Sequence, residues 1–221
     1  GQVLAEYAHL DSISARAGNG RVEIVTEGDD LTWVKNDKPK VFVTAHLANW
    51  ELAASTVVSM GIPLSVIYSP YKNPWIDRLI QKRRQPLGCG FLAKAQGIRS
   101  IVRELEAGRS IGMLVDHRVD SGEKVPFFGL DAETTIIPAR LALKYGYELV
   151  PIRVERVQRA RYRVTFYKPI ESPDPKLSNR GQAIEMTRQI NALIETWIRE
   201  RPELISFTKR RWSKEIRPKQ R

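Results

Sequence analysis

The stretch from residue 41 to residue 68 reads VFVTAHLANWELAASTVVSMGIPLSVIY and contains a complete strand–helix–strand pattern. Residues 41–45 and 64–68 are short, mostly apolar runs rich in β-branched residues, as buried strands are. Asn49 is a residue type that caps helices, so a helix is predicted from there to about Met60, before Gly61 interrupts the pattern. A helix between two buried strands indicates a parallel sheet.

The same alternation continues on both sides of this unit. Further strands are predicted at residues 21–25, 90–93, 111–115, 150–154 and 162–166, and further helices at 74–85, 98–105, 136–145 and 180–199. In the helix at 74–85 the apolar stripe is formed by Ile76, Leu79 and Ile80. The pattern predicts a single α/β domain over residues 1–221, with a mostly parallel or mixed sheet flanked by helices.

The charge of the chain points to an anionic partner. Its 36 basic and 25 acidic residues give a net charge of +11, which suits either a nucleic acid or an anionic membrane surface. Residues 209–221 read KRRWSKEIRPKQR and form a basic tail. The residues expected to contact an anionic surface there are Lys209, Arg210, Arg211 and Trp212.

Two features limit the possible classes of protein. The single cysteine, Cys89, excludes an internal disulfide framework and is interpreted as a buried structural thiol. Residues 52–71 carry no charge over 20 positions, but a Gly-Ile-Pro sequence and five serines or threonines interrupt them. They are therefore interpreted as a buried helix, a turn and a buried strand. The chain begins with Gly1 and lacks an initiator Met, so it is expected to be a fragment or a processed form.

His46 and His117 each follow a predicted buried strand, where active residues of parallel sheets gather. Glu51 follows His46 across a tight turn, and this spacing predicts a hydrogen bond between the two side chains. Such a carboxylate orients the imidazole as a general base. The spacing alone leaves open that His46 and Glu51 are ordinary residues of a strand end and a helix start. It is not the H-E-x-x-H pattern of zinc enzymes, and no metal is expected. No G-x-S-x-G motif marks an acyl-enzyme nucleophile.

The segment His46-Leu47-Ala48-Asn49-Trp50-Glu51 resembles the H-F-G-N-W-E block of the bacterial lipid A biosynthesis acyltransferases. Ordered matches continue over about residues 40–212, at Asn73-Pro74, Asp77-Arg78, Val115-Asp116, Val125-Pro126-Phe127-Phe128-Gly129, Pro138-Ala139-Arg140-Leu141-Ala142, Val150-Pro151, Arg201-Pro202-Glu203 and Arg210-Arg211-Trp212. The chain departs from the family at two positions beside the site. Ala48 replaces a glycine, with an expected φ in the ordinary range, and His117 stands where glutamine is frequent.

The resemblance implies a glycerolipid-acyltransferase-like fold with His46 and Glu51 as the catalytic pair. It implies an acyl carrier protein or coenzyme A thioester as donor, a lipid A precursor or related glycolipid as acceptor, and no cofactor beyond the acyl thioester. A glycerolipid or an inositol-mannoside lipid is the alternative acceptor. Location at the cytoplasmic face of the bacterial inner membrane is also implied, peripherally or through a hydrophobic anchor that would precede Gly1. A nucleic-acid-binding module, favoured by charge alone, is the rival hypothesis.

Supporting roles are expected for other residues. Asn49 is expected beside the catalytic pair, and Asp116 either positions His46 or a basic residue or caps its strand. Arg78, Arg83 and Arg84 hold lipid phosphates or the acidic carrier protein, or form a solvated face. The loop Phe127-Phe128-Gly129 is expected near the acyl tunnel, with its backbone N–H groups as hypothetical oxyanion donors. Arg140 is included as a supporting residue with an open role.

Overall fold

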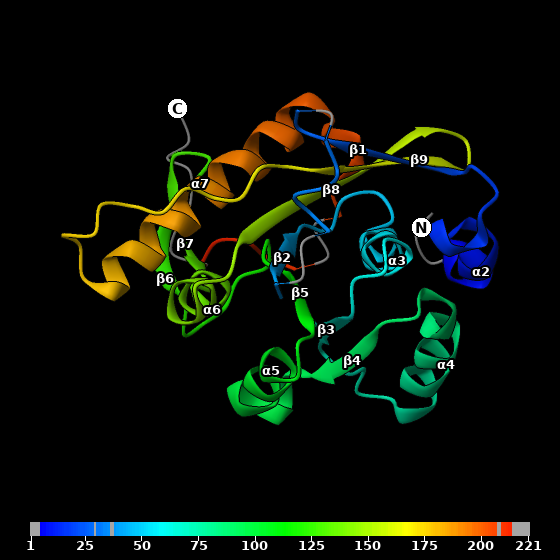
Figure 1. The fold of residues 1–221 in the computed structure, drawn as a ribbon, viewed down its shortest axis with the longest axis horizontal. Helices are drawn as coiled ribbons and strands as arrows, with labels where there is room; N and C mark the ends of the chain where they lie inside the picture. The colour runs from blue at the N-terminus through cyan, green and yellow to red at the C-terminus, as the bar shows by residue number, and fades with distance from the viewer. Residues whose placement is uncertain (1–4, 29, 36–37, 207–208, 214–221) are drawn as a thin grey trace.

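A seven-stranded mixed sheet forms the centre of the computed structural model, which describes residues 5–28, 30–35, 38–206 and 209–213 (Figure 1). The strand order is β1-β9-β8-β2-β5-β3-β4. Its strands are β1 (Val22–Thr26), β2 (Val41–Thr44), β3 (Leu64–Tyr68), β4 (Gly90–Ala93), β5 (Ser110–Leu114), β8 (Leu149–Gln158) and β9 (Arg161–Phe166). Neighbouring strands are parallel except β8 and β9, which are antiparallel. The predicted fold class is confirmed.

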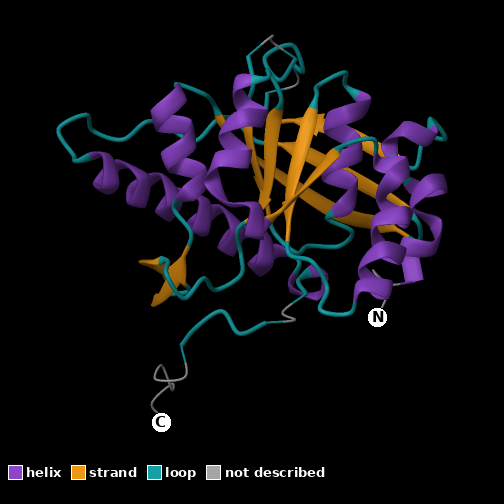
Figure 2. Cartoon of the chain, turned by 90° about the horizontal axis from the view of Figure 1, so that it is seen from below, coloured by secondary structure: helices purple, strands orange, loops and turns teal. Residues whose placement is uncertain are grey.

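Helices cover both faces of this sheet (Figure 2). One face packs against α2 (Leu10–Ile13), α3 (Glu51–Ser59) and α4 (Pro74–Arg84). The other packs against α5 (Gly97–Glu106), α6 (Ile137–Tyr145) and α7 (Asn179–Glu200). Short 3-10 turns are η1 (Tyr7–His9), η2 (Ala15–Ala17), η3 (Gln85–Leu87), η4 (Lys94–Gln96) and η5 (Pro202–Leu204).

The alternation of side chains along β2 explains why both faces are apolar. Val41 and Val43 belong to the core under α5, α6 and α7, whereas Phe42 belongs to the core under α3. A central parallel strand is buried on both sides and therefore reads as a continuous apolar run. Burying each such side chain contributes about 1.5–3 kcal/mol, so the sheet centre is well fixed and can position residues at its edge.

A hairpin was not predicted. It consists of β6 (Glu123–Phe127) and β7 (Leu130–Thr134), which pair antiparallel outside the main sheet. Its two-residue turn places Phe128 and Gly129 at φ 52° and 74°, which matches the tight turn with two positive φ angles that joins hairpin strands. Phenylalanine is not a usual residue there, so the sequence signal was weak.

Two predictions about helices have different outcomes. Residues 52–71 form most of α3, a turn and β3 as predicted, and none of the described helices has the length and apolarity of a membrane span. The predicted apolar stripe of α4 is wrong. Ile80 is buried, but the side chains of Ile76 and Leu79 are 46% and 55% exposed, because only one side of α4 meets the core.

Candidate active site

His46 lies two residues beyond the end of β2, and Asp116 lies two residues beyond the end of β5. Because these strands are parallel and adjacent, with Thr44 opposite Leu114, their carboxyl ends meet at one edge. Oδ1 of Asp116 is 2.8 Å from Nδ1 of His46, and Oδ2 accepts the backbone N–H of His46 at 3.1 Å. An Nδ1–H donated to a carboxylate leaves Nε2 with the lone pair of a general base.

Asp116 is suited to remain ionised. Burial raises the pKa of its carboxyl group, but the hydrogen bonds and charge of His46 more than offset this, and the pKa is lowered overall. A buried carboxylate at this distance stabilises the imidazolium that forms when His46 accepts a proton.

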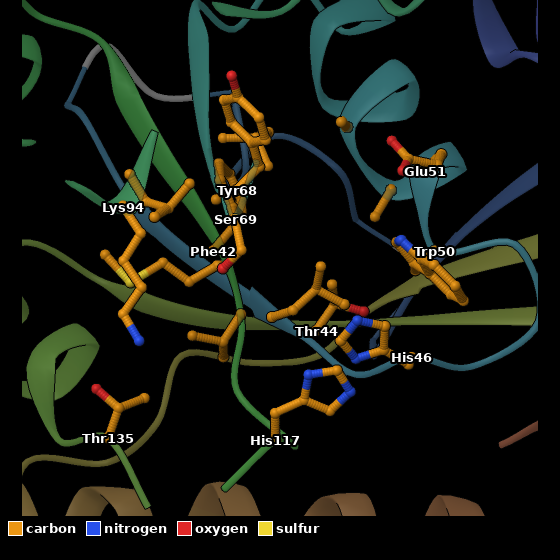
Figure 3. Close-up of a pocket in the computed structure, with 18 of the residues that line it drawn as sticks. Phe42, Thr44, His46, Trp50, Glu51, Tyr68, Ser69, Lys94, His117 and Thr135 are labelled. Atoms are coloured by element: carbon orange, nitrogen blue, oxygen red, sulfur yellow. The ribbon is translucent and has the colours of Figure 1, made fainter. Parts of the chain in front are cut away.

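Two aromatic side chains hold the His46 ring (Figure 3). The imidazole of His117 stacks on it with ring centroids 3.8 Å apart and planes 10° apart, and Trp50 meets it edge-on at 4.7 Å. Burial and the neighbouring His46 lower the pKa of His117 to about 4. His117 is therefore neutral at physiological pH and packs as an uncharged ring.

We expect His117→Gln to make folding stability less sensitive to acid. The folded-state pKa of about 4 lies below the ordinary 6.5, so the unfolded chain takes up this proton first as the pH falls. The contribution of His117 is thus fully present above about pH 6.5 and is lost toward about pH 4. Urea unfolding at about pH 7 and about pH 5 should show a smaller loss of unfolding free energy in the variant. Equal losses in both proteins would contradict the assignment.

The predicted hydrogen bond between His46 and Glu51 is wrong. The Glu51 carboxylate, 5% exposed, instead binds the Arg84 guanidinium through Nε at 3.0 and 3.2 Å and Nη2 at 2.6 Å. The Tyr7 hydroxyl donates to the same carboxylate. Glu51 lies on the α3 side of Trp50, apart from His46 (Figure 3). A carboxylate buried at the start of α3 needs a cation, and α4 supplies it.

This buried pair is electrostatically matched. Burial disfavours the charged form of Arg84, but the adjacent Glu51 outweighs this effect and raises the pKa of the guanidinium. Burial and the Glu51 charge raise the pKa of Tyr7. Arg84 and Glu51 are therefore a fixed ion pair that joins α3, α4 and η1 in one wall of the site.

The turn after His46 is fastened by the C-terminal segment. Ala48 has φ 45°, so the expectation of an ordinary φ is wrong, and this position is one where glycine is less strained. Its N–H donates to Leu204 O at 2.8 Å, and Ser206 N–H donates to His46 O at 2.9 Å. Asn49 does not cap α3 with its side chain, because Nδ2 donates to Glu6 Oε2 at 2.8 Å and Trp50 occupies the cap position.

A cavity of about 1320 Å³ opens beside His46 and His117 (Figure 3). It exceeds the roughly 300–1,000 Å³ typical of small-molecule pockets. Its apolar lining comes from both faces of the sheet. On the α3 side of the sheet the lining includes Phe42, Val57, Leu64 and Gly112, all buried. On the side of α5 and α6 it includes Val43, Met113, Ile98 and Ile137, of which the last two are 48% and 40% exposed.

Several predicted residues lie outside this cavity. The exposed side chains of Arg78 and Arg140 do not line it, and neither do Phe127, Phe128 and Gly129. The position of this loop near an acyl tunnel therefore gains no support from the cavity and stays a prediction. The Phe128 N–H donates to Glu195 Oε1 at 2.6 Å. That N–H is already used, so the oxyanion hypothesis is wrong for it.

The residues of the basic tail differ in burial and in their contacts. Arg211 is 2% exposed and binds Thr134 Oγ1 at 2.6 Å, and burial lowers its pKa to about 10. Trp212 donates to Phe127 O at 3.3 Å. The prediction that Arg211 forms a membrane surface is wrong, because its buried guanidinium links Thr134 of the hairpin to Asn191 of α7. Trp212 is half-buried, and its surface role stays a prediction. Arg210 is exposed and Lys209 lines the cavity; residues 214–221 lie outside the described residues.

One group of possible metal ligands occurs within the described residues, namely His46, Asp116 and His117, with ligand atoms within 4.8 Å of one another. The two imidazoles are stacked nearly parallel. Their lone pairs lie in the ring planes and so run side by side rather than converging on one ion. The group is better suited to proton transfer than to metal binding.

A family model described as bacterial lipid A biosynthesis acyltransferase matches residues 1–214. The chain belongs to this family. As a member of this family, the chain is an acyltransferase of lipid biosynthesis, which agrees with the resemblance of its sequence blocks. Among solved structures it is similar to the 1-acyl-sn-glycerophosphate acyltransferase PlsC from Thermotoga maritima, with 14% identity over 88% of this chain and 80% of that chain and a TM-score of 0.46. The comparison with curated proteins found no match.

Proposed function

We propose that this acyltransferase moves a fatty acyl chain from an acyl carrier protein or coenzyme A thioester to a hydroxyl of a lipid A precursor. The reaction would take place at the cytoplasmic face of the bacterial inner membrane. The observation that carries the proposal is the His46–Asp116 pair, 2.8 Å apart, at a cavity whose apolar lining comes from both faces of the sheet. Family membership supports the choice of acceptor.

The chemistry follows from the free Nε2 of His46. This nitrogen takes the proton of the acceptor hydroxyl as the oxygen attacks the thioester carbonyl. The tetrahedral intermediate then expels the thiolate, which receives the same proton from the imidazolium. Asp116 stabilises the imidazolium between these steps.

Burial raises the pKa of Cys89 to about 12, which argues against a thiolate nucleophile and for direct transfer.

The lining on the two faces of the sheet suits two different lipids. On the α3 side the lining consists of buried apolar side chains, and we assign this side to the donor chain. The rest of the lining includes exposed residues, among them Lys94 and Lys209. These ammonium groups suit the phosphates of a large anionic acceptor.

The proposal is tested with purified protein, acyl carrier protein thioesters and a lipid A precursor, with products identified by mass spectrometry. His46→Ala should lower turnover by about 10² to 10⁴-fold, the usual contribution of a general base. Parallel assays with a lysoglycerolipid and an inositol-mannoside lipid test the acceptor. Preference for either of these would contradict the lipid A assignment, and turnover of His46→Ala within tenfold of wild type would contradict the mechanism.

Gly112 is expected to set the length of the donor chain. It lies on β5, four residues before Asp116, or about 13 Å along a strand. An added Cβ would lie 3.3 Å from Val66 Cγ2 and 3.6 Å from Leu64 Cδ1, which line the cavity on the α3 side of the sheet. Gly112→Leu should therefore lower kcat/KM for long-chain thioesters at least tenfold, since one methylene in an apolar pocket is worth about 10 to 200-fold. Rates with short-chain thioesters serve as the control, and an equal loss for all lengths would contradict this role.

A further inference from the structure

Helix α4 presents three large apolar side chains to solvent. Trp75 is 75% exposed, Leu79 is 55% exposed and Ile76 is 46% exposed. Residues 75, 76 and 79 share one side of the helix because neighbours at three and four positions lie on the same face. Ile80, next to Ile76 on the helix, turns inward and is buried, and Arg84, which binds Glu51, lies opposite Trp75. Within the described part of the chain, the helix thus has an inner face that belongs to the site and an outer face that is exposed.

Cations accompany this outer face. Arg78, Lys82 and Arg83 are exposed and follow Trp75 or Leu79 at spacings of three or four residues. The Arg78 guanidinium lies 5.6 Å from the centre of the Trp75 ring. The acidic residue of the helix, Asp77, accepts the N–H of Tyr71 at 2.9 Å and so is turned to the preceding loop. The outer face therefore combines exposed apolar bulk with positive charge.

The outer face borders the entrance of the cavity. Tyr71 and Lys72 line the cavity directly before α4 begins, and both are exposed. Ile98 at the start of α5 also lines it and is 48% exposed. Helices α4 and α5 lie at the same end of the sheet, beside β4 (Figure 1). A surface that contacts α4 would therefore also meet the cavity entrance.

We propose that the outer face of α4 docks the enzyme on an anionic lipid bilayer, with Trp75, Ile76 and Leu79 inserted among the acyl chains and Arg78, Lys82 and Arg83 at the phosphates. Apolar side chains flanked by basic ones on one helix are the mark of an interfacial helix. Three large exposed apolar side chains on one helix favour a bilayer over the charged surface of an acidic carrier protein. This assignment rests on the proposed function for its lipid substrates; its readout is vesicle binding, and turnover serves as the control for folding and activity.

The test is sedimentation with phosphatidylcholine vesicles, with and without phosphatidylglycerol. Trp75→Ser/Ile76→Ser/Leu79→Ser should lower the partition coefficient onto anionic vesicles at least tenfold. Arg78→Gln/Lys82→Gln/Arg83→Gln should abolish the preference for anionic over neutral vesicles. The matched control is Val157→Ser/Leu177→Ser, which removes two apolar side chains of 49% and 43% exposure elsewhere, and it should bind like wild type.

Circular dichroism and turnover of a short-chain thioester with a detergent-dispersed acceptor show whether each variant is folded and active. If the apolar variant sediments like wild type, the docking surface is refuted even where turnover supports the proposed function. If it keeps vesicle binding but loses binding to acyl carrier protein, or loses a concentration-dependent dimer, the face belongs to that partner and the inference is also refuted. Loss of vesicle binding with intact turnover supports it.

Discussion

Asp116→Asn is expected to lower turnover by about 10² to 10⁴-fold while leaving the fold and substrate binding nearly unchanged. An asparagine keeps the size of the side chain but carries no charge. It therefore cannot stabilise the imidazolium, and its amide group can favour the wrong His46 tautomer. Both oxygens of Asp116 contact His46, so the substitution directly impairs the residue that transfers the proton. The fall should appear in kcat with little change in KM, as for an interaction made mainly in the transition state.

The matched control is Asp120→Asn, the same change at a side chain that is 88% exposed and pairs with Arg118. It should retain turnover within about twofold, because exposed ion pairs contribute only about 0–1 kcal/mol. Asp116→Asn at more than one third of wild-type turnover would show that His46 does not depend on this carboxylate. Thermal unfolding of both variants separates a catalytic loss from a folding defect.

Much of the fold was predictable because short stretches of sequence show the hydrophobic pattern of each strand or helix. The buried strands at β2, β3 and β5 read as short apolar runs, and α7 reads as a long amphipathic helix. The position of His46 at a strand end could also be predicted from the neighbouring residues alone. The β6–β7 hairpin was missed because its turn uses Phe128 at a positive φ, without the Asn-Gly signal that marks such turns.

The partner of His46 was harder to predict because it is set by topology. Glu51 is near in sequence, but the helix start turns it to Arg84, while Asp116 arrives from a strand 70 residues away that is adjacent only in the folded sheet. The order of the strands was the missing information. Val115-Asp116 at the end of a predicted central strand was the available signal, since the ends of parallel strands meet at one edge.

The exposure of one face of α4 was not predicted, for a different reason. A periodic apolar pattern indicates a buried face, but it does not distinguish burial in the protein from burial in a lipid surface. In α4 only Ile80 is buried, and the cations that alternate with Trp75 and Leu79 are the local sign of the second case. In the tail, Arg211 shows the reverse error, since a basic run predicted as surface contains a buried guanidinium.

Arg84→Met is expected to destabilise the protein by about 3–5 kcal/mol, because it leaves the Glu51 carboxylate buried without its cation. The guanidinium makes three hydrogen bonds to this carboxylate, and Tyr7 then remains as its donor. Urea unfolding measures the loss, and Arg83→Met, the same change at the exposed neighbour, should stay within about 0.5 kcal/mol of wild type.

The double variant Glu51→Gln/Arg84→Met removes both charges and should recover at least about half of the lost stability, because no uncompensated charge is left inside. Its turnover then decides the role of Glu51, which stays a prediction as a catalytic residue. Turnover near that of wild type in a stable double variant would make the ion pair a support for the wall of the cavity. Turnover lowered about 10²-fold or more would place the carboxylate in the chemistry. A single Arg84→Met variant as stable as Arg83→Met would mean that water or a rearranged side chain already neutralises Glu51, and the wall would not depend on the pair.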